Sequence, residues 1–174
     1  MANGMGNTIL PFDEINRLEM TLPAYFDNGK IKSDLLDDLL DALEDLFLLS
    51  YALGENAKNF ATRLYTCCLG RDPEADGLNY WGLALTNLEK TGCEAAGFFF
   101  TGAEFEGLGT SNEEYVKRLY KTFMDRTPAA DEVKYWVGQI KSTKMNRKAV
   151  LEFFGQCEEF TNICAKYGID RGTI

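Results

Sequence analysis

Two pairs of neighbouring aromatic residues have the type and spacing expected of a binding surface. Tyr80-Trp81 and Tyr135-Trp136 each lie in a segment with helical periodicity. Neighbouring residues of a helix point about 100° apart, so both rings of a pair cannot face the same core. We expect each Trp to pack inside and each Tyr to lie at the edge with its hydroxyl hydrogen-bonded. An exposed tyrosine face could stack on a sugar or on a protein partner; packing at the boundary of the core is the alternative.

Arg71 and Arg126 form a second candidate pair, because each precedes the proline of a short loop. A guanidinium is a planar fork of donors that grips a carboxylate or a sulfate, so either arginine could hold an anion. The same fork can bridge loop carbonyls and a helix end, and we favour this structural role. Six further residues at equivalent positions of the two loops and the helices that follow them form a structural signature for packing and capping: Pro73, Asp76, Trp81, Pro128, Asp131 and Trp136. We expect each aspartate of this signature to be the N-cap of the next helix.

The residue types of most catalytic and metal sites are missing from the sequence. The chain has no histidine, which excludes Ser-His and Cys-His nucleophile pairs and histidine-ligated zinc. Its five cysteines include no Cys-x-x-Cys, and we expect reduced thiols, with a Cys67–Cys93 disulfide as the alternative. The segment from Asp72 to Gly77 resembles the opening of a calcium loop, but Leu83 stands where a bidentate carboxylate is required. We predict no catalytic residue, no metal site and no cofactor.

Charge and hydropathy limit the classes of partner. The 174 residues carry 18 Lys and Arg against 27 Asp and Glu, a net charge of -9. Nucleic-acid affinity comes from clustered basic residues, so we expect no nucleic-acid partner. The longest charge-free apolar stretches, 46–54 and 95–103, are far shorter than the ~20 residues of a membrane-spanning helix. We therefore expect no membrane insertion.

An internal repeat with an offset of 55 residues organises the chain. The segment Arg63-Leu64-Tyr65 recurs as Arg118-Leu119-Tyr120. In each copy the apolar residues follow the helical period in three successive segments, with Ser111, Thr91 and Asn146 in N-cap positions. The same offset, without a gap, relates the other identical pairs: Arg71/Arg126, Pro73/Pro128, Ala75/Ala130, Asp76/Asp131, Tyr80/Tyr135, Trp81/Trp136, Phe98/Phe153, Phe99/Phe154, Glu104/Glu159 and Phe105/Phe160.

We therefore predict an all-α fold of two three-helix repeats in tandem, residues 59–110 and 111–174, with no sheet. Residues 1–58, whose 4 basic and 11 acidic residues give a net charge of -7, form an acidic helical N-terminal segment. Two repeats are fewer than a free-standing array needs, so this segment is expected to pack on the repeats and form one compact unit with them. Its main helix, Ser33–Leu53, is amphipathic with a predicted buried stripe: Leu36, Leu39, Leu40, Leu43 and Phe47.

The motif Leu69-Gly70-Arg71-Asp72-Pro73, followed by Asp76-Gly77-Leu78 and Tyr80-Trp81, resembles that of a bacterial domain-of-unknown-function family with tandem LGR-x-P…G-L-x-Y-W helical repeats. It is also similar to the motif of phycobilisome linker domains. The resemblance covers about residues 59–169, and the second copy departs from it where Asp125 and Glu132 replace glycines. Members of the family recur in secreted and surface proteins, and no catalytic residues are established for them. The resemblance implies an all-helical, extracellular or cell-surface module, although the first residues do not form a signal peptide, which leaves the cytoplasm open.

The leading functional prediction is a non-catalytic interaction or scaffold module of a secreted or cell-surface bacterial protein that binds protein or cell-wall glycan. Its candidate binding residues are Tyr80, Tyr135, Arg71 and Arg126. One alternative is a carboxylate-dependent hydrolase, lytic or glycosidic, which needs two nearby carboxyl groups, one with a raised pKa. Another is self-association, in which the acidic helix meets the basic stretch near Lys144. The chain would then be a monomer or a weak homo-oligomer whose mass falls with added salt.

Overall fold

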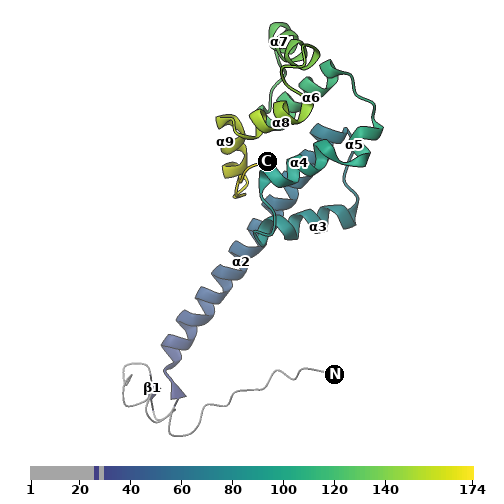
Figure 1. Ribbon diagram of the computed structural model, residues 1–174. Helices are drawn as coiled ribbons and strands as arrows, with labels where there is room; N and C mark the ends of the chain where they lie inside the picture. Colours follow the sequence, from purple (N-terminus) through teal and green to yellow (C-terminus); the bar gives the residue numbers. More distant parts are fainter. Residues whose placement is uncertain (1–25, 28–29) are drawn as a thin grey trace, which may run out of the picture. The chain divides into compact units, whose positions relative to one another are not determined.

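The computed structural model describes residues 26–27 and 30–174, and these residues are mostly helical (Figure 1). The all-α prediction is confirmed. Outside the helices, β1 (Phe26–Asp27) and β2 (Lys30–Ile31) pair antiparallel over two residues each. The part of the predicted N-terminal segment that precedes residue 26 lies outside the described residues. In the part of the chain that the structure describes, no helix is both long and apolar enough to cross a membrane.

Helix α2 (Ser33–Leu64) continues beyond residue 53, where the first predicted helix ends. It also runs through the boundary predicted between residues 58 and 59. Gly54 does not stop the helix, because one glycine in a helix interior costs only about 1 kcal/mol relative to alanine. The chain divides into two compact units within α2, the first ending at Leu49 and the second spanning Ser50–Ile174.

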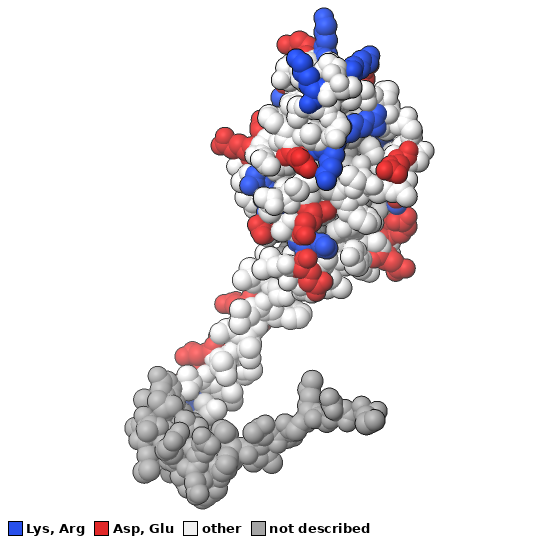
Figure 2. All heavy atoms as spheres, in the orientation of Figure 1, with Lys and Arg blue, Asp and Glu red and all other residues white. Residues whose placement is uncertain are grey.

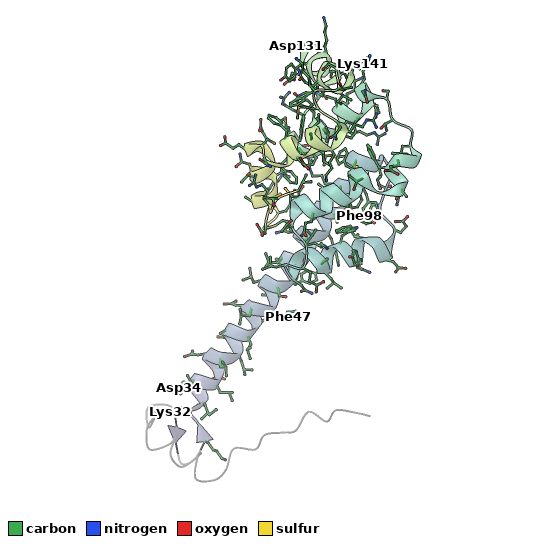
Figure 3. All side chains as sticks on the ribbon, in the orientation of Figure 1. Lys32, Asp34, Phe47, Phe98, Asp131 and Lys141 are labelled. Atoms are coloured by element: carbon green, nitrogen blue, oxygen red, sulfur yellow. The ribbon has the colours of Figure 1, made fainter. Side chains whose placement is uncertain are left out.

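The apolar face of α2 in the first unit is exposed, which corrects the buried stripe predicted from the sequence. The exposed fraction ranges from 44% at Leu36 to 71% at Phe47, a residue labelled in Figure 3. The buried residues of α2 come later in the helix, at positions such as Ala57 and Phe60. Helical periodicity places apolar residues on one face but does not specify what covers them. The packing of residues 1–58 on the repeats stays a prediction.

Helix α2 passes directly into a short π-helix, η1 (Tyr65–Leu69), which ends at Gly70 with a φ of 78°. A π-helix has more residues per turn than an α-helix, so the side chains in it leave the α-helical register. This explains why Cys67 is only half-buried, although the α-helical period predicts it on the buried face with Phe60 and Leu64. Glycine tolerates the left-handed φ at the end of η1 without steric cost.

The later helices of the second unit occur in two sets with equal spacing. The first set starts at residues 75, 92 and 103, and the second at residues 130, 147 and 158, so each start recurs 55 residues later. This is the offset that relates the identical residue pairs. In chain order the helices are α3 (Ala75–Thr86), α4 (Gly92–Thr101), α5 (Ala103–Gly107), α6 (Asn112–Met124), α7 (Ala130–Lys141), α8 (Arg147–Gly155) and α9 (Glu158–Lys166).

The third helix predicted in each copy is two helices in the structure, α4 followed by α5 and α8 followed by α9. The break falls at Gly102 and at Cys157, which both have extended backbone angles and serve as N-caps. At Gly102 a Cβ atom would lie 2.9 Å from the backbone carbonyl oxygen of Phe98, so the turn leaves no room for a side chain. The apolar pattern continues on both sides of the break, which is why periodicity did not predict it.

The N-cap predictions are right at three positions and wrong at two. The side chains of Thr91, Ser111 and Asn146 each accept a hydrogen bond from the backbone amide three residues later. Asp76 and Asp131 are not N-caps, because α3 and α7 begin before them. Each aspartate lies in the first turn of its helix, where its negative charge is still favourable near the helix N-terminus.

One aromatic core joins the two sets of helices in the second unit. The ring of Phe123 (α6) is fully buried and lies 5.8 Å from Phe100 (α4) and 4.5 Å from Phe160 (α9), measured between ring centroids. Phe160 in turn lies 6.2 Å from Phe60 of α2. Because rings from both sets meet at Phe123, the two sets bury their aromatic faces against each other.

All five cysteines are free thiols in the structure, so the alternative Cys67–Cys93 disulfide is not formed. Burial raises the pKa of Cys93 to about 11 and that of Cys164 to about 12. Burial also raises the pKa of Cys68 and Cys157. Cys67 and Cys157 are both half-buried, and Cys67 lines an open surface hollow. Since the thiolate is the reactive form of cysteine, the five thiols should differ in reactivity.

We expect Ellman's reagent at about pH 8 to react rapidly with one thiol of the native chain, Cys67. After unfolding without reductant, all five thiols should react. The Cys67→Ser variant should lose the rapid phase, and Cys157→Ser, which changes another half-buried thiol, should retain it. A rapid reaction of several thiols in the native chain would contradict the burial described above.

Candidate functional site

The Tyr80-Trp81 pair forms an aromatic cluster with Phe98, which α4 places beside α3 (Figure 3). Trp81 is 5% exposed, whereas Tyr80 and Phe98 are 58% and 62% exposed. The ring centroid of Trp81 lies 5.2 Å from each of the two exposed rings. The buried indole therefore supports an exposed ring on each of two neighbouring helices.

The second copy repeats this arrangement around Trp136. Trp136 is 7% exposed, and its neighbours Tyr135 on α7 and Phe153 on α8 are 58% and 53% exposed. Their ring centroids lie 5.1 and 4.9 Å from that of Trp136. The Trp136 indole also donates a hydrogen bond to the Tyr120 hydroxyl at 3.1 Å. The predicted burial of both tryptophans and edge position of both tyrosines are confirmed.

The tyrosine hydroxyls correct one detail of the prediction. Within the described residues, the structure gives the hydroxyls of Tyr80 and Tyr135 no hydrogen-bond partner, although the sequence analysis expected one. Both side chains are well exposed, so water can satisfy their polar ends. A hydroxyl that is not engaged inside the protein is available to a ligand.

A groove of about 720 Å³ lies over the first cluster, and we refer to it as the aromatic groove. Tyr80, Trp81 and Phe98 line one part of it, and the C-terminal residue Ile174 lines another. Polar side chains from α4 and α8 also line it, which gives the groove both apolar and hydrogen-bonding surface. These polar residues are Glu94, Thr101 and Lys148, with Lys90 from the preceding loop.

Arg71 and Arg126 are held by carboxylates of the chain itself. Arg71 donates a hydrogen bond to Glu104 at 2.8 Å and forms an ion pair with Glu74 at 2.8 Å. Arg126 donates to both carboxylate oxygens of Glu132, at 2.8 and 2.7 Å. Each guanidinium also lies over the tyrosine ring of the preceding helical segment, 4.9 Å and 4.7 Å from the centroid. Because both forks have internal partners, this geometry favours the structural role over anion binding.

Glu132, one of the two departures from the family motif, changes how the second loop is held. The equivalent residue Gly77 leaves room for the Tyr65 hydroxyl, which a Cβ atom would approach to 2.3 Å. In the second copy Glu132 stands at this position. Its carboxylate accepts hydrogen bonds from Arg126 and, at 2.7 Å, from the amide of Ala129. The hydrogen bonds from Arg126 and then from Ala129 lower the pKa of Glu132 to about 2.

We expect the contribution of Glu132 to stability to depend on pH. Because folding lowers its pKa, the carboxylate stabilises the fold above its unfolded value near pH 4.5 and ceases to do so as the pH falls to about 2. The wild type should therefore melt at a higher temperature than Glu132→Gln at about pH 6, and the difference should vanish near pH 2. Asp131→Asn, a change at the neighbouring residue, serves as the control. A Glu132→Gln difference that does not change with pH would contradict the prediction.

Two further arginines cross between helix α6 and the segment formed by α2 and η1. Arg63 of α2 donates hydrogen bonds to the carbonyl of Thr122 at 3.0 Å and to the carboxylate of Asp125 at 2.9 Å, both at the end of α6. Arg118 of α6 donates to the carbonyl of Cys68 in η1. Each arginine therefore caps the C-terminal end of the other's helical segment, where carbonyls lack intrahelical partners. The sequence signal was the Arg-Leu-Tyr identity, which we had assigned to the repeat but not to this exchange.

One comparison with known proteins matches part of this architecture to a family model. Residues 95–164 match the family Domain of unknown function (DUF4214). The DUF4214 match begins within α4 and ends within α9, so it contains the second aromatic cluster but not Tyr80 or Trp81. No curated protein and no solved structure matches the chain. The match supports the resemblance to a domain-of-unknown-function family, whereas its tandem motifs and its occurrence in secreted or surface proteins stay predictions.

The sequence identified half of each aromatic cluster. Tyr80 and Tyr135 were singled out, but Phe98 and Phe153 were assigned only to an apolar helix. The signal was present, because each of these residues is followed by a second phenylalanine about 100° further around the helix. The two rings of each Phe-Phe pair therefore point in different directions, and in the structure Phe98 and Phe153 are the exposed ones. Which ring is exposed depends on how α4 and α8 pack, and this the sequence did not show.

Proposed function

We propose that this chain is a non-catalytic binding module whose ligand contacts the exposed Tyr and Phe rings of the two aromatic clusters. The observation that carries the proposal is that both copies expose the same two rings at the edges of a buried tryptophan. Side chains that served only to fill the core would be buried, yet these four are more than half exposed. Aromatic rings at a protein surface are enriched at binding sites.

The chemistry of the aromatic groove favours a glycan. Tyr80 and Phe98 offer ring faces, and Glu94, Thr101 and Lys148 offer acceptors and donors nearby. A sugar presents apolar C–H faces and hydroxyl groups together, so it needs both kinds of surface at one site. A protein partner is the other ligand class that exposed aromatic rings can serve. The proposed setting, outside the cell or at its surface, rests on the family resemblance.

The pKa values of the carboxyl groups support a binding role rather than hydrolysis. A hydrolase using two carboxyl groups needs one with a raised pKa to act as the acid. Among the described residues, the carboxyl groups with a displaced pKa are all lowered, by hydrogen bonds from arginine or from backbone amides: Glu74, Glu94, Glu104, Asp125 and Glu132. In the described part of the chain, no group of three or more Cys, Asp or Glu residues is placed to hold a metal ion.

Tryptophan fluorescence of the full chain tests the proposal. In the Trp136→Phe variant Trp81 is the only tryptophan, and it lines the aromatic groove. Oligomers of N-acetylglucosamine and soluble cell-wall polysaccharide are the probes. We expect a saturable change in Trp81 emission with at least one of them. Tyr80→Ala and Phe98→Ala should each weaken binding by about 10-fold or more, which corresponds to about 1.4 kcal/mol.

The matched control is Leu83→Ala, which removes an exposed side chain of α3 that does not line the groove. This variant should bind as the parent does. Absence of saturable binding to every glycan probe would overturn the glycan assignment, and binding that survives both Tyr80→Ala and Phe98→Ala would overturn the site. Release of new reducing ends from a probe would contradict the non-catalytic role.

A further inference from the structure

Helix α2 carries a face for which the described residues of its own unit provide no cover. This face, which we call the leucine face, consists of Leu36, Leu39, Leu40, Leu43, Leu46 and Phe47. With about half or more of most of these side chains exposed, the leucine face presents an apolar patch on the order of the largest found on a typical monomer, about 300–600 Å². A patch of this size is typical of an interaction site.

The charges around the leucine face are all of one sign. Residues 33–49 contain six acidic and no basic residues (Figure 2, red). At 100° per residue, Asp37 and Glu44 lie along one edge of the leucine face, and the other acidic residues lie towards the back of the helix. Asp37 and Glu44 are seven residues apart, so they are separated by about 10.5 Å along the helix axis. A partner should therefore offer an apolar surface with two cations at this spacing.

The second unit contains a groove with that pattern. It lies between α6 and α7, has a volume of about 670 Å³, and is called here the lysine groove. Its lining includes the apolar side chains of Val133 and Val137, three lysines, Lys117, Lys134 and Lys141, and one acidic residue, Glu113. Basic side chains gather over this end of the unit in Figure 2 (blue), where Figure 1 shows α7.

The lysines of this groove are available to a partner. Lys117, Lys134 and Lys141 are exposed and form no ion pair with any residue that the structure describes. Lys90 and Lys121, by contrast, each pair with a carboxylate of the chain. Lys134 and Lys141 are seven residues apart on α7, the same spacing as that of the two acidic residues on α2.

We propose that the leucine face of α2 docks in the lysine groove of a second copy of this chain. Apolar side chains of the leucine face contact Val133 and Val137. Asp37 and Glu44 face Lys134 and Lys141. The contact joins two different surfaces, so a pair of copies still has one free leucine face and one free lysine groove, and the assembly can extend from copy to copy. This inference is independent of the aromatic groove. The lysine groove takes the role that the sequence analysis gave to the basic stretch near Lys144 in self-association.

Sedimentation of the full chain at several concentrations and salt levels tests the inference. We expect a weight-average mass above the 19.6 kDa of one chain at about 0.05 M NaCl, falling towards it at about 0.5 M NaCl, where the screening length is near 4 Å. Pairing of two leucine faces is the rival arrangement. Because it brings two acidic helices together, it would strengthen with salt and would overturn the proposal. A single-chain mass under every condition would also overturn it.

Charge-reversal variants test whether self-association depends on the proposed contact or only on the net charge of the chain. Asp37→Lys/Glu44→Lys and Lys134→Glu/Lys141→Glu should each weaken self-association by about 10-fold or more, since each sets like charges against each other. An equimolar mixture of the two double variants should associate again, because each then offers a complementary surface to the other. The control Lys144→Glu/Lys166→Glu makes the same change in net charge outside the lysine groove. An equal loss in this control, or no recovery in the mixture, would contradict the proposed contact.

Discussion

Phe123→Ala is expected to lower the free energy of unfolding by about 3–5 kcal/mol. The Phe123 ring is fully buried and packs against Phe100, Phe154 and Phe160, which come from both sets of helices. Removing it leaves a cavity where the two sets meet, and close-packed neighbours fill such a cavity only in part. Chemical denaturation followed by circular dichroism measures the loss.

Phe98→Ala is the matched control, because it removes the same side chain from an exposed position. Phe98 is an edge of the aromatic groove rather than part of the core, so its loss should cost less than about 1 kcal/mol. Phe153→Ala should behave in the same way, since Phe153 has the equivalent position in the second copy. Losses as large as that of Phe123→Ala would show that these rings stabilise the fold and are not free for a ligand.

Arg118→Ala should lower the free energy of unfolding by about 2–3 kcal/mol, and Arg63→Ala by a similar amount. Arg118 is largely buried and donates a charge-assisted hydrogen bond to the carbonyl of Cys68. Arg63 is also largely buried and donates to the end of α6. Without the guanidinium, carbonyls at a helix end lose their charge-assisted donors. The same denaturation experiment measures both losses.

Arg118→Lys and Arg126→Ala are the controls for this exchange. Lysine keeps the charge but not the planar fork, so Arg118→Lys should recover less than half of the stability that Arg118→Ala loses. Arg126 is more exposed than Arg63 and Arg118, and Arg126→Ala should cost less than about 1 kcal/mol. Losses below about 0.5 kcal/mol for both Arg118→Ala and Arg63→Ala would contradict the role of these two arginines in joining α6 to the segment formed by α2 and η1.

The parts of the fold that depend on local chemistry were predictable from the sequence. Thr91, Ser111 and Asn146 cap helices because their side chains reach an amide three residues away, and this requires no tertiary information. The burial of Trp81 and Trp136 followed from the angle between neighbouring residues in a helix, together with the larger apolar surface of tryptophan. Equal spacing of the helices followed from the repeated identities.

The parts that depend on tertiary contacts were not predictable. The stripe that includes Leu36 and Phe47 has the pattern of a buried face, yet it is exposed, because a pattern does not supply a partner. The π-helix that turns Cys67 partly out of the core has no signature in the apolar period. Likewise, the exchange needs Arg63 to reach the carbonyl of Thr122, 59 positions away in sequence, and Arg118 to reach the carbonyl of Cys68, 50 positions away.

These features explain how one helical design can serve binding. The identical residue pairs of the repeat divide into two groups by position in the structure. Trp81, Trp136 and the loop arginines are engaged inside the protein and hold the helices together. Tyr80 and Tyr135 lie outside this framework, together with the exposed phenylalanine of each copy. A rigid support with exposed rings favours binding, because little side-chain order has to be lost when a ligand contacts it.

Ring-proton NMR of the full chain, with labelled phenylalanine and tyrosine, tests the central claim most directly. The chain is titrated with the N-acetylglucosamine oligomers or the cell-wall polysaccharide. We predict that the ring signals of Tyr80 and Phe98 shift and saturate together, while those of the buried rings Phe123 and Tyr115 stay in place. Saturable binding that leaves the Tyr80 and Phe98 signals unchanged would contradict the claim, as would a titration in which no probe shifts any exposed ring.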